Sequence, residues 1–98
     1  MSRVRYSQKA EDDLIGIGEY TLRSWGEAQA ERYLAALEEC CEMLGNNPEL
    51  GRSCEEIRPG LRRFEQGKHV VFYRKDAEGI VVSRILHQSM LAEPHDLT

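Results

Sequence analysis

The sequence predicts an α+β domain in which an N-terminal helical hairpin packs on an antiparallel sheet, in the order β-α-α-β-β-β. Two observations support this prediction. The first half of the chain contains two long segments with apolar residues at helical spacing, and the second half contains three short β-rich segments separated by turn residues. Because 98 residues suffice for one modest core, we expect a single domain over residues 1–98.

The first elements are a short strand and a helix. Val4 and Tyr6 alternate with polar residues, which predicts a strand. Ser7 is placed to cap a helix that runs to about Ser24, and three acidic residues follow near the positive end of the helix dipole. The apolar stripe of this helix contains Ala10, Leu14, Ile17 and Thr21.

A second helix follows a break at Trp25-Gly26, where glycine supplies the turn and we expect the indole to fill the joint. Its apolar residues fall at i, i+3, i+4, i+7, i+11 and i+14, namely Ala30, Tyr33, Leu34, Leu37, Cys41 and Leu44. The helix ends at 45–48, where glycine, two asparagines and proline follow one another. The short connection makes the two helices an antiparallel hairpin.

Three strands are predicted after an irregular segment at 49–60: Leu61–Gln66, His69–Lys75 and Ile80–His87. Tight turns would place Arg62 opposite Tyr73, and Tyr73 opposite Val82. One face of the sheet would then contain Arg62, Phe64, Val71, Tyr73, Val82, Arg84 and Leu86. The other would contain Leu61, Arg63, Val70, Phe72, Arg74, Val81, Ile85 and His87. We expect the polar tail from Ser89 to Thr98 to be coil or short helix.

Composition excludes several classes of protein. The net charge of −4 argues against a general nucleic-acid binder. No run approaches the roughly 20 apolar residues of a membrane span, and the charged start of the chain has no leader character, so we expect a cytoplasmic protein. The three cysteines form no disulfide framework, and the histidines are scattered, so neither a metal site nor a cofactor is expected.

Arginine is concentrated in the predicted sheet, where each of the three strands carries at least one. Arg84 interrupts a β-branched run, so on a buried face it would need an acidic partner. Arginines and His87 could together bind a phosphate and move a proton, as RNA cleavage requires. However, no carboxylate is clearly placed as a base, and no tyrosine follows Tyr73. Taken singly, each arginine is more typical of a solvated or ion-paired sheet residue.

Several segments in this order resemble the ParE toxins of the RelE/ParE superfamily. The resemblance covers nearly the whole chain. It rests on Asp13-Leu14 and Tyr20 in the first predicted helix, Trp25-Gly26 at the joint, Ala30 with Tyr33-Leu34 in the second helix, Arg58-Pro-Gly-Leu-Arg62, His69-Val-Val-Phe-Tyr-Arg74, and Arg84-Ile-Leu-His87-Gln-Ser-Met90.

The resemblance implies the toxin of a bacterial type II toxin–antitoxin pair that inhibits DNA gyrase. Its partner would be an acidic-tailed ParD-like antitoxin with a DNA-binding domain, so that the toxin reaches DNA only through the antitoxin. Toxicity or target contact is then expected at Arg62, Arg84, His87 and Gln88. Antitoxin contact is expected at Leu14, Ile17, Tyr20, Phe64, Tyr73 and Arg74, with acidic side chains meeting Arg74 or Arg84.

Two alternatives remain. RelE-like relatives cleave messenger RNA on the ribosome, and Arg62 or Arg63, Arg84 and His87 occupy places comparable to their basic residues. Gln88 lies where such enzymes often carry a tyrosine, and the acidic net charge suits ribosome binding poorly, so the gyrase branch and a non-enzymatic toxin are favoured. The third hypothesis is a regulatory module without toxicity.

Overall fold

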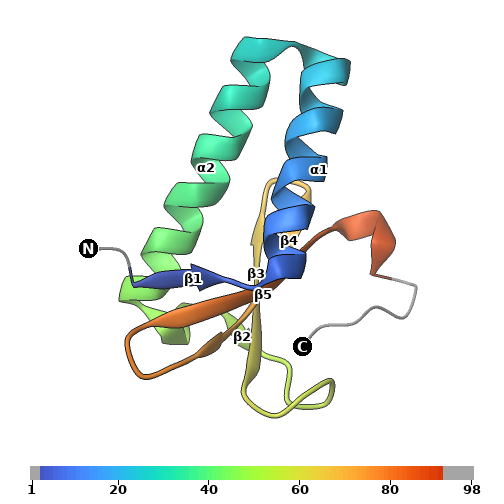
Figure 1. Ribbon diagram of the computed structural model, residues 1–98. Helices are drawn as coiled ribbons and strands as arrows, with labels where there is room; N and C mark the ends of the chain where they lie inside the picture. The colour runs from blue at the N-terminus through green and yellow to red at the C-terminus, as the bar shows by residue number, and fades with distance from the viewer. Residues whose placement is uncertain (1–2, 92–98) are drawn as a thin grey trace.

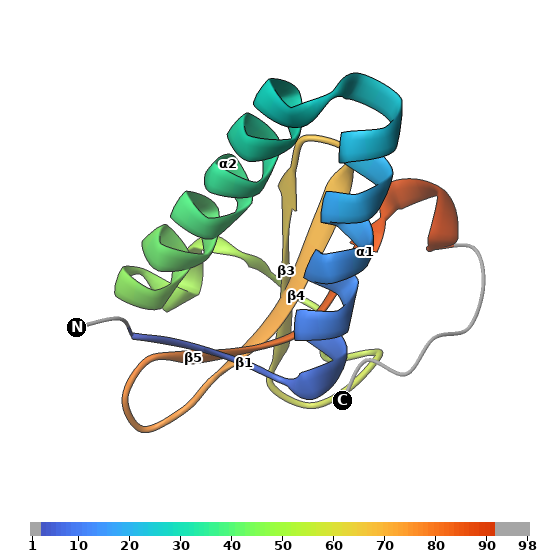
Figure 2. The ribbon, with the colours of Figure 1, turned by 45° about the horizontal axis from the view of Figure 1, so that its top comes forward.

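The computed structural model describes residues 3–91, in which two helices cover one face of a five-stranded sheet (Figure 1). The strand order is β1-β5-β4-β3-β2. The elements are β1 (Val4–Tyr6), α1 (Gln8–Trp25), α2 (Glu27–Asn46), the 3₁₀ turn η1 (Pro48–Leu50), β2 (Arg52–Ser53), β3 (Leu61–Gln66), β4 (His69–Lys75), β5 (Ile80–His87) and the 3₁₀ turn η2 (Gln88–Met90). With the molecule turned by 45°, α1 and α2 lie side by side in front of the sheet, and β3 and β4 are visible between them (Figure 2).

The α+β prediction and the bounds of the three C-terminal strands are confirmed. Two details were wrong. β1 pairs with β5 in parallel, because the chain between them crosses over through the helical hairpin. The segment predicted to be irregular contains β2, whose two residues pair with Arg63 and Arg62 and are too few to show an alternating pattern. The 3₁₀ turn η2 lies at the start of the predicted tail. The part of the tail beyond Leu91 lies outside the described residues.

Ser7 joins the first helix to the sheet. As predicted, its hydroxyl oxygen accepts a hydrogen bond from the backbone N–H of Ala10, at 3.0 Å. The same hydroxyl donates to the carbonyl of Ser83 at 2.8 Å, and the Ser7 N–H donates to the carbonyl of Val82 at 3.0 Å. The start of α1 is therefore fixed to β5 just where β1 ends.

The joint between the helices is the single exposed residue Gly26. Gly26 has φ +88°, a left-handed conformation that glycine adopts without steric cost, and its N–H donates to the carbonyl of Leu22. Trp25 does not fill this joint, contrary to expectation, because 69% of it is exposed. Glycine alone makes the turn, so the indole is left on the surface.

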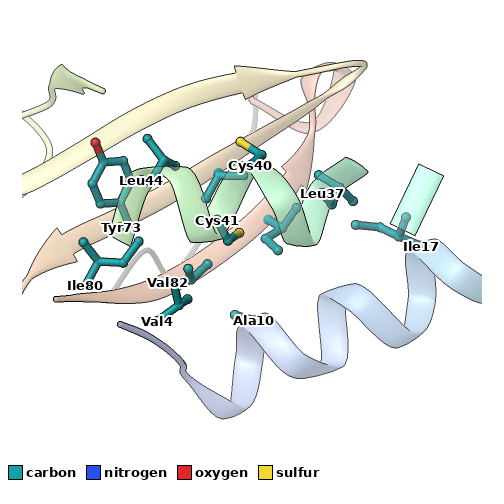
Figure 3. Close-up of a cluster of buried hydrophobic side chains, with 12 residues drawn as sticks. Val4, Ala10, Ile17, Leu37, Cys40, Cys41, Leu44, Tyr73, Ile80 and Val82 are labelled. Carbon is teal, nitrogen blue, oxygen red and sulfur yellow. The ribbon is translucent and has the colours of Figure 1, made fainter. Parts of the chain in front are cut away.

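The main core lies between the helices and the sheet (Figure 3). It contains the buried side chains of Val4, Ala10, Ile17, Leu37, Cys40, Cys41, Leu44, Val71, Tyr73, Ile80, Val82 and Ile85. A smaller cluster on the opposite face contains Cys54, Leu61, Val70, Phe72 and Leu86, with Leu91 packed against it. No helix among residues 3–91 is long and apolar enough to span a bilayer.

A β-bulge in β5 changes which side chains face the helices. Tyr73 pairs with Val82, as predicted, but Phe72 pairs with Arg84, so Ser83 is an extra residue. The predicted faces are therefore correct for β3, β4 and the start of β5, and wrong from residue 84 onward. Because side chains alternate, one extra residue moves Arg84 to the open face and His87 to the helix face. Leu86 and Ile85 exchange faces in the same way, as their two clusters show.

Candidate partner-binding surface

Two histidines form the centre of the surface at the ends of β4 and β5. His69 and His87 are paired across the strands, and the bulge places His87 on the helix side of the sheet, where His69 also lies. Their rings meet edge to face, with centroids 5.2 Å apart. Residues 18 positions apart in the sequence are thus brought into direct contact.

Tyr33 of α2 holds His69 in one orientation. Its hydroxyl lies 2.5 Å from His69 Nδ1 and accepts a hydrogen bond from the Lys68 backbone N–H at 3.1 Å. Since the oxygen accepts from Lys68, the hydroxyl proton is available to His69 Nδ1. Burial, reinforced by the neighbouring His87, lowers the pKa of His69 to about 4, so this ring is neutral near pH 7. His87 Nδ1 in turn accepts from the backbone N–H of Ser89 at 3.1 Å.

Two adjoining hollows of about 340 and 260 Å³ flank the histidine pair. Both are lined by Tyr20, His69 and His87, and the larger one also by Trp25 and Tyr33. Tyr20 and Trp25 are 62% and 69% exposed. This histidine pocket is therefore an aromatic, solvent-accessible surface between α1 and the strand ends, of the kind that anchors protein partners.

Arg84 binds Asp13 of α1 rather than pointing freely into solvent. Its Nε and Nη2 atoms donate to the two carboxylate oxygens at 2.8 and 2.9 Å. The side chains of Arg84 and Asp13 are 16% and 14% exposed. Asp13 Oδ2 also accepts a hydrogen bond from the backbone N–H of Ile85 at 2.9 Å. Ile85 lies beyond the last residue of β5 that pairs with β1. The acidic partner that the sequence requires for Arg84 therefore comes from the chain itself.

Arg62 and Tyr73 hold the connection that follows α2. Arg62 Nη1 donates to the carbonyl of Gly51 at 2.6 Å, and the Tyr73 hydroxyl donates to the carbonyl of Pro48 at 2.7 Å. The Gly51 N–H donates to the Tyr73 oxygen at 2.8 Å. Tyr73, one of the residues expected to contact an antitoxin, has no exposed surface, because its ring fills the core beneath α2.

The remaining candidate residues are spread over several surfaces. Gln88 is exposed in η2 beside the histidine pocket, and Arg74 is exposed on the open face of the sheet. Leu14 and Phe64 are half-buried against the main core, and Ile17 is 8% exposed. Of the ten residues predicted to act, the structure gathers only Ile17, Tyr20 and His87 around one pocket. Among residues 3–91 no cluster of three or more histidine, cysteine or carboxylate side chains could hold a metal ion.

Sequence reasoning missed Asp13, Tyr33 and His69 as parts of these sites. Asp13 was interpreted as a complement to the helix dipole, and Tyr33 as part of a core stripe. Each has its partner more than thirty residues away, so no local pattern indicates the contact. The cross-strand position of His69 opposite His87 becomes visible only when the bulge is counted.

Gly67 offers a test of how Tyr33 is held. Its φ of +60° favours glycine, and an added Cβ would lie 2.9 Å from the Tyr33 hydroxyl oxygen. We expect Gly67→Ala to lower the free energy of unfolding by about 1–2 kcal/mol in urea denaturation. Gly16→Ala is the matched control, because nothing lies within 4 Å of its added Cβ and the helix gains propensity. Equal stability of the two variants would contradict the expected strain.

Two solved structures described as toxin–antitoxin systems contain a chain with the same arrangement. The chain matches a structure described as the chromosomal ParDE system of P. aeruginosa with a TM-score of 0.73 and 24% identity, covering 89% of this chain and 96% of that one. It matches the RelBE2 toxin–antitoxin complex of Mycobacterium tuberculosis with a TM-score of 0.64 and 25% identity, covering 86% and 94%. The fold is therefore that of the small α+β toxins of the RelE/ParE type.

Sequence comparison identifies the family. The profile of the ParE toxin of type II toxin–antitoxin systems matches residues 4–92. Toxin ParE1 of Mycobacterium tuberculosis is 43% identical over 90 residues, which cover 91% of this chain and 92% of that protein. Toxin ParE1 of Caulobacter vibrioides is 40% identical over 95 residues, which cover 97% and 98%. The chain belongs to the ParE toxin family and is the toxin component of a type II toxin–antitoxin system.

Proposed function

We propose that this toxin inhibits DNA gyrase and is neutralised by a ParD-like antitoxin. The observation that supports the proposal most directly is the match to the ParE family over residues 4–92. Gyrase acts in the cytoplasm, so the proposal also requires a cytoplasmic toxin. The target surface we propose is the histidine pocket with Gln88, where exposed aromatic and polar groups lie side by side.

The dispersal of the basic residues weakens the alternative of RNA cleavage. His87 lies on the helix side of the sheet, and Arg84 is already bound to Asp13, which lines the smaller hollow beside the histidines. Arg62 is opposite Tyr73, four residues along β4 from the histidine pair, which corresponds to roughly 13 Å of strand. A scissile phosphate held by His87 would therefore not meet both arginines. Protonating or orienting groups must lie within hydrogen-bond reach to act.

The antitoxin would cover apolar surface of the helical hairpin and the open face of the sheet. Arg74 is exposed there, and no ion pair of its side chain is found among residues 3–91, so it is the arginine best placed to meet an acidic tail. Arg84 is a weaker candidate because Asp13 already neutralises it. Through such a complex the toxin would reach operator DNA only by way of the antitoxin.

A supercoiling assay tests the proposal. Purified toxin is expected to block gyrase-catalysed supercoiling of relaxed plasmid, and addition of the antitoxin is expected to restore it. Gln88→Ala should weaken inhibition by about tenfold if this exposed side chain contacts the target. Glu56→Ala, an exposed change in the 54–60 connection, is the matched control and should leave inhibition unchanged.

Three outcomes would decide against gyrase inhibition. Normal supercoiling at saturating toxin would exclude it outright. Codon-linked cuts in translated messenger RNA that vanish in His87→Ala would favour the ribonuclease. Normal growth of cells that express the toxin without antitoxin would favour a non-toxic regulatory module.

A further inference from the structure

The larger hollow of the histidine pocket is lined by three aromatic side chains besides the histidines. It has a volume of about 340 Å³ and lies between α1, the first turns of α2 and the turn that joins β3 to β4. That turn ends between the two helices in both views (Figure 1, Figure 2). Tyr20 and Trp25 are mostly exposed, and Tyr33 is half-buried. Exposed aromatic faces around one hollow suit a planar ring that stacks against them.

Both histidines have one ring nitrogen left for a ligand, and that nitrogen carries a hydrogen. His69 Nδ1 accepts from the Tyr33 hydroxyl, whose oxygen is itself occupied by the Lys68 backbone N–H. His87 Nδ1 accepts from the backbone N–H of Ser89. In an imidazole whose Nδ1 accepts, the hydrogen is on Nε2. Each ring therefore offers a ligand a hydrogen-bond donor and no acceptor.

Three further side chains around the larger hollow also present donors. The side-chain carbonyl of Gln29 accepts from Arg32 at 2.9 Å, which leaves the amide N–H groups of Gln29 to a ligand. The Lys68 ammonium takes part in no ion pair among residues 3–91. The indole N–H of Trp25 can only donate. None of the residues that line this hollow, all of them within the described chain, is acidic.

We infer that the larger hollow binds a small planar aromatic acid, with the ring against Tyr20 and Trp25 and the carboxylate close to Lys68 and the histidine N–H groups. A carboxylate accepts several hydrogen bonds and carries one negative charge, which matches a lining of donors with one cation. The volume is at the lower end of the range for small-molecule sites. A single ring with a short acid chain therefore fits better than a nucleotide.

Two other occupants match these groups less well. Aromatic side chains also attract cations, but a cation here would meet the Lys68 ammonium and find no carboxylate in the lining. A phosphate dianion would have one lysine to balance two negative charges. It would also lie near Asp12 and Asp13, which line the adjoining smaller hollow. A single carboxylate on an apolar ring avoids both conflicts.

The inference does not rest on gyrase inhibition. Binding of an aromatic acid is a property of the free toxin and is measured without any target protein. A toxin that binds the acid but leaves supercoiling unchanged would refute the proposed function alone. A toxin that blocks supercoiling but does not bind the acid would refute this inference alone.

Binding of 3-phenylpropionate to the full-length toxin tests the inference. Trp25 is the only tryptophan of the chain, so its fluorescence reports on the larger hollow directly. We expect saturable quenching with a dissociation constant of about 1 mM or below. Backbone NMR shifts should be largest at residues 67–69 and 87–89, which lie on two sides of the hollow.

Analogues of the probe separate its charge from its ring. 3-Phenylpropionamide keeps the ring and loses the charge, and 3-phenylpropylamine reverses the charge. Each is expected to bind about tenfold more weakly than the acid, because a charged acceptor makes stronger hydrogen bonds with the same donors. Acetate supplies the carboxylate without the ring and should not quench Trp25.

Two variants separate the anion site from the ring site. Lys68→Gln should weaken binding of 3-phenylpropionate about fivefold and leave binding of the amide unchanged. The backbone N–H that holds Tyr33 is kept in this variant. Tyr20→Ala, at an exposed helix position where folding is little affected, should weaken binding of the acid and the amide alike. Lys75→Gln removes the same charge at the far end of β4, outside both hollows, and as the matched control should leave binding unchanged.

Saturable binding that requires both the charge and the ring, and that is weakened in Lys68→Gln but not in Lys75→Gln, would support the site. The inference is overturned if the acid fails to bind at about 10 mM, if the amide or the amine binds as well as the acid, or if phenyl phosphate binds better. It is also overturned if a peptide with an internal phenylalanine–aspartate pair binds and the free acid does not, because the hollow would then belong to a protein interface.

Discussion

Replacing Asp13 by alanine is expected to lower the free energy of unfolding by about 3 kcal/mol. The substitution removes both hydrogen bonds to the Arg84 guanidinium and leaves that charge only 16% exposed without its carboxylate. It also leaves the backbone N–H of Ile85 without its acceptor. Urea denaturation followed by far-UV circular dichroism would measure the loss.

A double-mutant cycle isolates the ion pair. Arg84→Met removes the charge but keeps an apolar stem, so Asp13→Ala with Arg84→Met should cost less than the sum of the single changes. Asp12→Ala is the neighbouring control: its exposed carboxylate accepts one hydrogen bond from Gln8, and its loss should change stability by less than about 0.5 kcal/mol. Additive single effects would show that Asp13 acts only as a cap for Ile85.

Lowering the pH from 7 to 4 is expected to destabilise the protein by about 2 kcal/mol through His69. Burial lowers the pKa of this ring to about 4, whereas an unfolded histidine titrates near 6.5. Between these values the unfolded chain takes up a proton that the folded chain does not. The stability is therefore fully present above pH 6.5 and falls as the pH drops toward 4, with about half the loss above pH 5.

His69→Gln is the control for this pH dependence. Its stability at pH 7 falls because the contact with Tyr33 is changed, but the slope between pH 6.5 and 5 should largely disappear. This window lies above the range in which carboxylates such as Glu49 and Asp76 act, because their ion pairs hold the pKa of each below its usual value. If the variant kept the same slope, His69 of the original protein would take up its proton at the same pH in the folded and the unfolded chain.

Most of the fold follows from local patterns, but the site does not. Period-two alternation and tight turns predict β3, β4 and their register, and helical spacing predicts α1 and α2, because each signal lies within one segment. The bulge at Ser83 has no such signal, since serine is unremarkable in a strand. One inserted residue was enough to misplace Arg84 and His87, the two residues on which the functional hypotheses depended. The partners of both come from α1 and β4, at distances along the chain that no pattern spans.

Ser83 also determines how tolerant β5 is of changes in length. Its own hydroxyl oxygen is buried and has no hydrogen-bond partner among the described residues, while its carbonyl anchors Ser7. Substituting the side chain would remove only that orphaned group. Deleting the residue would restore strict alternation but keep Arg84 opposite Phe72 and His87 opposite His69, because the pairing of β5 with β4 already skips Ser83. The deletion would instead remove the Ser83 carbonyl that accepts from the Ser7 hydroxyl, so the start of α1 would lose one of its two hydrogen bonds to β5 while the histidine pocket kept its pairing.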